Sequence, residues 1–69
     1  METSIPVYVR ENLSKLHEER EFYSLSPEQL QKLSGVRADI TRAYENGTGT
    51  PTRSKYNKLA EFFGWEEWE

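Results

Sequence analysis

The chain has 69 residues, a formal net charge of −3 and no cysteine, which allows one small domain and excludes disulfide bonds and thiolate metal sites. Its single histidine, His17, leaves too few ligands for a zinc site, no apolar run reaches the roughly 20 residues of a membrane span, and the N-terminus lacks a secretory signal. We therefore expect one domain over residues 1–69, in the cytoplasm, with no metal, cofactor or membrane partner.

Charge is distributed unevenly along the chain. Residues 37–58 carry five basic side chains against Asp39 and Glu45, whereas residues 59–69 carry four glutamates and no basic side chain. Salt screens charges over about 8 Å, so a local basic face matters more to a polyanion than the net charge does.

The first helix is predicted over residues 5–20, with Ser4 as its N-cap. Its apolar side chains recur at helical spacing and should be buried: Val9, Leu13 and Leu16. The next residues, EFYSL (21–25), break this period. They supply Phe22, Tyr23 and Leu25 to pack between helices.

The second helix, over residues 26–34, has the clearest start in the sequence. Ser26 and Gln29 form a predicted capping box, and Pro27 stands at the first helical position, where its missing N–H costs nothing. Leu30 and Leu33 form its predicted buried side. Gly35 ends the helix, since glycine adopts the positive φ of a sharp helix end.

A third helix is predicted over residues 37–46 and a fourth over residues 51–63. Thr50 before Pro51 repeats the cap-then-proline pattern, and the apolar stripe of the fourth helix is Tyr56, Leu59, Ala60 and Phe63. Residues 64–69 form a short tail, and β-branched residues never alternate as in a strand. The sequence predicts an all-α, compact bundle of four to five helices.

Two short helices joined at a glycine form a helix-turn-helix, whose second helix can enter the major groove. Residues 25–65 resemble the core of the Cro and phage-repressor (XRE) family, a lambda-repressor-like fold, in the following positions: Leu25, Ser26, Leu30, Gly35, Val36, Glu45, Gly47, Pro51, Leu59, Ala60 and Gly64. The resemblance implies a transcriptional regulator of a phage or mobile element, a repressor of Cro or C1 type in a bacterial or phage-infected cell. Its partner would be a double-stranded DNA operator.

Three residues depart from the family pattern. Pro27 replaces a glutamine that touches DNA, Gln31 replaces a small alanine, and Thr41 replaces an apolar residue of the recognition helix. The last two changes make the packing between the two helices more polar.

Two registers of the recognition helix compete. Plain periodicity buries Val36, Ile40, Ala43 and Tyr44, whereas the family register buries Val36, Thr41 and Tyr44. Both registers place Ala38 on the outward side and leave Arg37 and Arg42 accessible.

The candidate DNA contacts follow from side-chain chemistry. An arginine pairs bidentately with guanine, an aspartate accepts from cytosine, and an alanine meets a thymine methyl. The alternative role of Asp39, as a residue near the N-terminus of its helix, is to stabilise the helix dipole. The candidates for base contact are Arg37, Ala38, Asp39, Thr41 and Arg42; those for phosphate contact are Ser26, Asn46, Thr48, Arg53 and Lys55.

The tail offers a second kind of surface. Phe62, Phe63, Trp65 and Trp68 are too dense to be hidden easily in a domain of this size, and we expect Trp65 and Trp68 to contribute to a homodimer, unless an oligomerisation domain lies outside these residues. The alternative function is a helix-turn-helix-like module that binds a regulatory protein, as an antirepressor or adaptor, and does not read DNA. Nothing in the sequence predicts an enzyme, because His17 has no catalytic partners at a supporting spacing.

Overall fold

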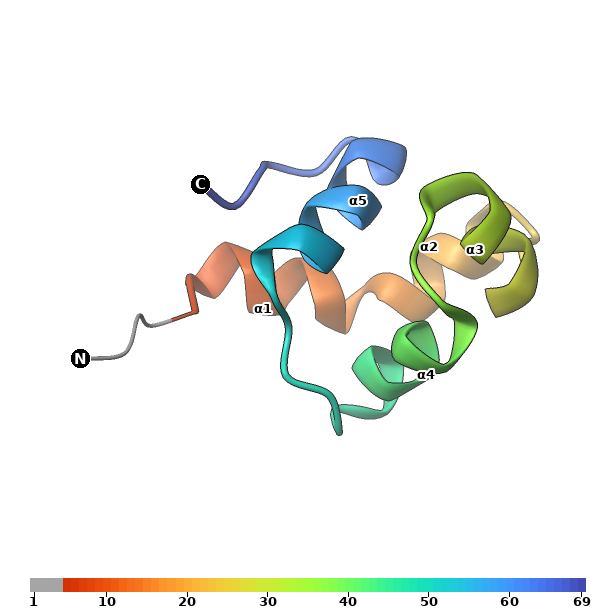
Figure 1. Ribbon diagram of the computed structural model, residues 1–69, viewed down its shortest axis with the longest axis horizontal. Coiled ribbons are helices and arrows are strands. Elements are labelled where there is room, and N and C mark those ends of the chain that lie inside the picture. Colours follow the sequence, from red (N-terminus) through yellow and green to blue (C-terminus); the bar gives the residue numbers. More distant parts are fainter. Residues whose placement is uncertain (1–4) are drawn as a thin grey trace.

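The computed structural model describes residues 5–69, so the predicted cap Ser4 lies outside the described residues. Within that range the protein is an all-α globule of five helices without strands. The helices are α1 (Val7–Ser14), α2 (Leu16–Phe22), α3 (Pro27–Ser34), α4 (Ala38–Asn46) and α5 (Arg53–Phe63). In Figure 1, α1 and α2 cross the middle of the molecule, with α5 above them, α4 below and α3 at the end opposite the N-terminus. No helix in the described range is long and apolar enough to cross a membrane.

The prediction of one helix over residues 5–20 was wrong in its continuity and its start. The first helix begins at Val7, and Lys15 leaves the helical region at φ −95° and ψ 1°, which separates α1 from α2. The predicted stripe is confirmed, since Val9, Leu13 and Leu16 are all buried. Leu16, after the break, packs into the same core as Val9 and Leu13.

The segment after α2 differs from its prediction. Phe22 is 81% exposed and Tyr23 is half exposed, so neither is enclosed between helices, whereas Leu25 packs against the core as expected. Ser24 turns the chain with a left-handed φ of 57°, and the Leu25 N–H donates to the Arg20 carbonyl. This turn points Leu25 inward and leaves Phe22 outside.

The capping box predicted for α3 is confirmed. The Ser26 hydroxyl accepts from the Gln29 N–H, the Gln29 side chain accepts from the Ser26 N–H, and Gly35 takes the left-handed conformation at φ 84°. Leu30 is fully buried, but Leu33 is exposed, contrary to the prediction. The inner side of α3 runs through Leu30 and the half-buried Ser34, one turn later, and this leaves Leu33 beyond its edge.

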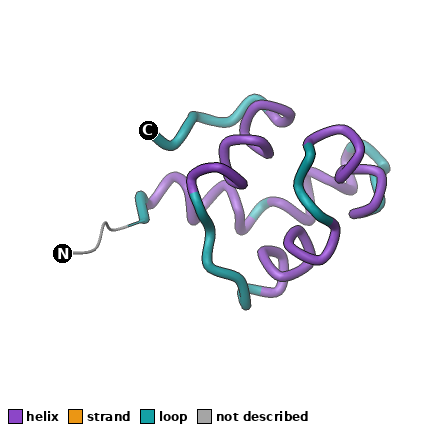
Figure 2. The backbone as a smooth tube through the Cα atoms, viewed as in Figure 1, coloured by secondary structure: helices purple, strands orange, loops and turns teal. Residues whose placement is uncertain are grey.

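The last helix starts two residues later than predicted. Thr52, not Thr50, is the N-cap, and its hydroxyl accepts from the Lys55 N–H, so Pro51 stays in the connection over residues 47–52. Figure 2 shows this as the longest connection between two helices. Tyr56, Leu59 and Ala60 are buried, Phe63 is half-buried, and residues 64–69 are not helical.

One hydrophobic core draws on every helix and on the tail. Its buried members are Val9, Leu13, Leu16, Leu30, Val36, Tyr44, Tyr56, Leu59, Ala60 and Trp68. Trp68 packs edge-on against Tyr56, and Asn57 holds its backbone through two hydrogen bonds of 2.8 Å. The tail is therefore docked on α5 and completes the core.

Candidate nucleic-acid interface

The helices α3 and α4 are joined by three residues, 35–37, and hydrogen bonds tie them together. The Gln31 side-chain oxygen accepts from the Ala38 N–H at 2.9 Å, and the Ser34 hydroxyl accepts from the Val36 N–H at 3.2 Å. Gln31 thus satisfies one of the free N–H groups at the start of α4. The sequence indicated only that Gln31 makes this packing polar; its partner is not apparent from local spacing.

The buried face of α4 follows the family register. Val36, Thr41 and Tyr44 are buried, whereas Ile40 and Ala43 are half-buried. The plain periodic reading was therefore wrong for this helix. The order of the buried positions fixes which face of α4 meets solvent.

Two candidate DNA contacts lie on the buried face of α4. Thr41 is 0% exposed and cannot reach a duplex, so its assignment as a DNA contact was wrong. Ala38 is also buried, contrary to both registers, because Gln31 holds its backbone against α3. The buried Thr41 hydroxyl has no hydrogen-bond partner, which is an unfavourable state for a buried polar group.

The exposed face of α4 carries both predicted arginines, each paired with a carboxylate. Arg37, the N-cap residue, contacts Asp39 at 3.1 Å, and Arg42 donates to Glu28 at the start of α3. The hydrogen bond from Arg42 holds the pKa of the Glu28 carboxyl below its ordinary value. Glu28 was not singled out from the sequence, although its place in the first turn of α3 puts it beside α4.

The flanking candidates divide into free and occupied groups. Asn46 is exposed at the end of α4, and Lys55 is half exposed in the first turn of α5. Thr48 instead closes α4, since both its N–H and its hydroxyl donate to the Ala43 carbonyl. Arg53 lies over the Trp68 ring at 5.4 Å, so its guanidinium engages the tail. The Ser26 hydroxyl accepts within its capping box and keeps its own proton to donate.

A nearly buried ion pair fixes α4 against α2. Arg20 contacts Glu45 through two nitrogens, at 2.7 and 3.0 Å, and donates to the Leu25 carbonyl at 2.8 Å. Burial alone would raise the pKa of Glu45, but the hydrogen bonds and charges of Arg20 and His17 outweigh it and hold that pKa below its ordinary value. His17 is exposed, as expected, with its ring near Glu45 and Glu21.

The chain matches no protein-family model, no curated protein and no solved structure. Its resemblance to the Cro and phage-repressor family therefore depends on the residues themselves. Glu45 is one of these, and the sequence alone did not reveal Arg20 as its partner, because the two residues lie 25 positions apart.

The dimer candidates differ in exposure. Trp68 is only 7% exposed and belongs to the core, so its assignment to a dimer surface was wrong. Trp65 is half-buried and stacks on Phe63 at 4.9 Å and on Tyr56 at 5.9 Å. Among residues 5–69, no group of three or more histidines and carboxylates is placed to hold a metal ion.

Proposed function

We propose that the protein is a sequence-specific, double-stranded DNA-binding regulator of transcription, with a lambda-repressor-like helix-turn-helix formed by α3 and α4. The observation that carries the proposal is the orientation of α4, which buries Thr41 and Tyr44 and exposes Arg37, Arg42 and Asn46. In this fold the exposed face of the second helix enters the major groove.

The exposed residues have the chemistry of base and phosphate readers. Arg37 and Arg42 supply planar donors for guanine, Asp39 accepts from cytosine, and Asn46 donates to phosphate or base edges. At the start of α3 only the Ser26 hydroxyl and the Glu28 N–H can donate to phosphate, because Pro27 has no N–H and the Gln29 N–H donates to Ser26. The Glu28 carboxylate opposes an anion there.

The existing ion pairs do not prevent these contacts. The Arg37 and Asp39 side chains are 72% and 63% exposed, and exposed pairs contribute about 0–1 kcal/mol. A bidentate arginine–guanine contact discriminates by about 1–3 kcal/mol. Because the contact with guanine contributes more than the exposed ion pair, Arg37 should exchange the Asp39 carboxylate for DNA.

A single recognition helix covers few base pairs, so two copies on half-sites about one helical turn apart would form the specific complex. The alternative is a protein-binding module that does not read DNA. The pairing of both arginines with carboxylates of the same chain favours this alternative, because it neutralises the face that would meet phosphate.

The test begins by selecting duplexes from a randomised pool on the full chain. Fluorescence anisotropy then measures the affinity of the recovered duplex between about 50 and 200 mM salt. Two phosphate contacts predict about a tenfold loss of affinity over that range. Failure to recover any preferred sequence, together with equally weak binding of every duplex at the lowest salt, would exclude DNA reading and leave the alternative.

A further inference from the structure

An aromatic surface lies where the ends of α2 and α5 meet. We define it by five residues, Phe22, Tyr23, Phe62, Phe63 and Trp65. Their rings form a continuous series: Phe22 meets Tyr23 at 5.2 Å, Tyr23 meets Phe62 and Phe63 at 6.0 Å each, and Phe63 stacks on Trp65 at 4.9 Å. Exposure is greatest at the α2 end, at Phe22.

This surface is larger than the fold itself requires. Phe62, Phe63 and Trp65 pack against the core, whereas Tyr23 is half exposed and Phe22 packs on Tyr23 alone among these rings. Contiguous exposed apolar groups on a small protein mark interaction sites, and aromatic residues dominate the energetic centres of such sites. The aromatic surface is therefore available to a partner.

The charges around the aromatic surface are mostly negative. Helix α2 carries three glutamates against Arg20, which is occupied by Glu45, and Glu61 precedes Phe62 on α5. The other glutamates of the tail lie farther along it, where Arg53 packs over Trp68. Glu18 and Glu19 lie one helical turn before Phe22 and Tyr23, on the same side of α2. Lys58, one turn before Phe62, is the basic residue at this edge.

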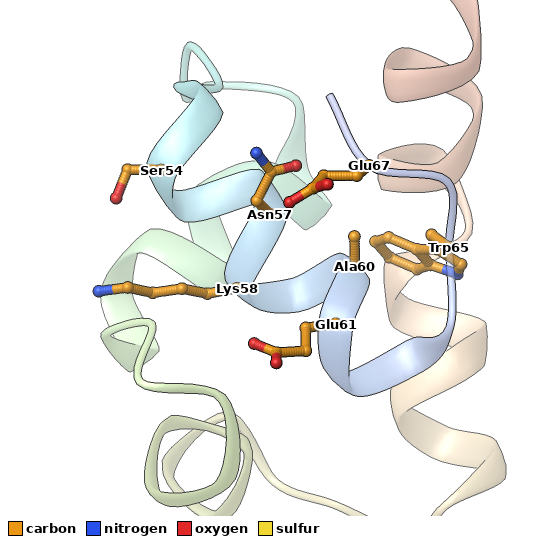
Figure 3. Close-up of a pocket in the computed structure, with 7 residues that line it drawn as sticks. All are labelled: Ser54, Asn57, Lys58, Ala60, Glu61, Trp65 and Glu67. Carbon is orange, nitrogen blue, oxygen red and sulfur yellow. The ribbon is translucent and has the colours of Figure 1, made fainter. Parts of the chain in front are cut away.

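A hollow of about 380 Å³ extends the surface past Trp65. It lies between α5 and the tail, and Figure 3 shows the residues that line it: Ser54, Asn57, Lys58, Ala60, Glu61, Trp65 and Glu67. Glu61 comes from α5 and Glu67 from the tail. The hollow thus offers two carboxylates and an aromatic ring against the single ammonium of Lys58, and this net negative lining suits the head group of an arginine or lysine.

We infer that the aromatic surface and this hollow bind a basic, apolar segment of another protein. The apolar side chains of the segment cover Phe22 and Tyr23, and its arginine or lysine residues meet Glu18, Glu19 and Glu61. A second copy of this chain fits less well, because a two-fold contact would bring the same carboxylates together, and DNA is repelled by them. In Figure 1 the C-terminal end of α5 lies at the top and α4 at the bottom, so the aromatic surface is separate from the recognition helix.

A displayed library of random 16-residue peptides, selected on the full chain, tests the chemistry of the partner. The expected peptides combine aromatic or aliphatic residues with excess arginine and lysine. Their affinity, measured from the fluorescence of Trp65 and Trp68, falls as salt rises. Recovery of neutral or acidic peptides, or of no peptide, overturns the inference.

Matched variants test the location. Phe22→Ser should lower the affinity for the selected peptide about tenfold, as expected for an aromatic residue at the centre of an interface. Val7→Ser, which removes another exposed apolar side chain, at the far end of α1, should leave the affinity for the peptide unchanged. The charge variant Glu18→Gln/Glu61→Gln should lower the affinity for the peptide and make that affinity less dependent on salt. Equal affinity of Phe22→Ser and Val7→Ser for the peptide refutes the site, and so does a dimer of the chain in sedimentation that Phe22→Ser abolishes.

Discussion

The ion pair between Arg20 and Glu45 should be the strongest single polar contribution to stability in the described structure. Their side chains are 12% and 10% exposed, and Arg20 also satisfies the Leu25 carbonyl. Removing one partner leaves the other charge with little access to water. Such a loss costs about 3–5 kcal/mol for a fully buried pair and about 0–1 kcal/mol for an exposed one. This pair lies close to the buried limit, so we expect Glu45→Ala to cost about 3 kcal/mol.

A double-mutant cycle isolates the pair itself. Arg20→Ala, Glu45→Ala and the double variant are unfolded in urea and followed by tryptophan fluorescence, and the coupling energy should be about 2 kcal/mol. Arg37 and Asp39 provide the matched control, because their pair has a similar distance but is mostly exposed. Its coupling should be below about 0.5 kcal/mol. Equal couplings for the two pairs would refute the reasoning from burial.

The same pair predicts a dependence on pH. The pKa of Glu45 is lower in the folded state than its ordinary value, so the unfolded chain binds more protons as pH falls. The stabilisation is complete above the unfolded pKa of about 4.3 and is lost as pH falls through the lower, folded pKa. The difference in unfolding free energy between the wild type and Glu45→Gln should therefore be constant near neutral pH and shrink below about pH 4. A difference that does not change with pH would contradict this assignment.

Three further changes test the candidate interface and the core. Glu28→Gln should raise the affinity for a selected duplex about two- to fivefold, because it frees Arg42 and removes a negative charge beside phosphate; anisotropy showing no gain would count against that role. Thr41→Val should raise the free energy of unfolding by about 1 kcal/mol, since it removes a buried hydroxyl without a partner, and should leave duplex affinity unchanged; a loss of affinity would mean that Thr41 reaches DNA. Trp68→Ala should lower the free energy of unfolding by about 3 kcal/mol in urea denaturation, whereas a mainly associative role would change the sedimentation of the chain and spare its stability.

Local chemistry made some elements predictable. The capping box of Ser26 and Gln29 and the left-handed Gly35 depend on residues a few positions apart, and both are as predicted. The cap of α5 was predicted less well: Thr50 and Thr52 flank Pro51, and it is the Thr52 hydroxyl that accepts from the Lys55 N–H. Nothing local marks the break at Lys15, where neither proline nor glycine interrupts the helix.

In the candidate nucleic-acid interface too, features set by nearby residues were predictable, whereas contacts between distant residues were not. Periodicity alone placed Thr41 outward because a threonine carries little apolar character, and the spacing of the resembling family placed it inward, where it lies. The partners of Gln31, Glu28 and Arg20 come from other helices, so their roles required the folded chain.

The central proposal is that the exposed face of α4 reads DNA, and chemical-shift mapping of the ¹⁵N-labelled protein with a selected duplex tests it most directly. If α4 reads DNA, the largest shifts fall on its exposed positions Asp39, Arg42 and Asn46, on its N-cap Arg37, and on the first turn of α3. The aromatic surface should stay unshifted in the same spectra. Shifts confined to the ends of α2 and α5, or no shifts at saturating duplex, would show that α4 does not read DNA.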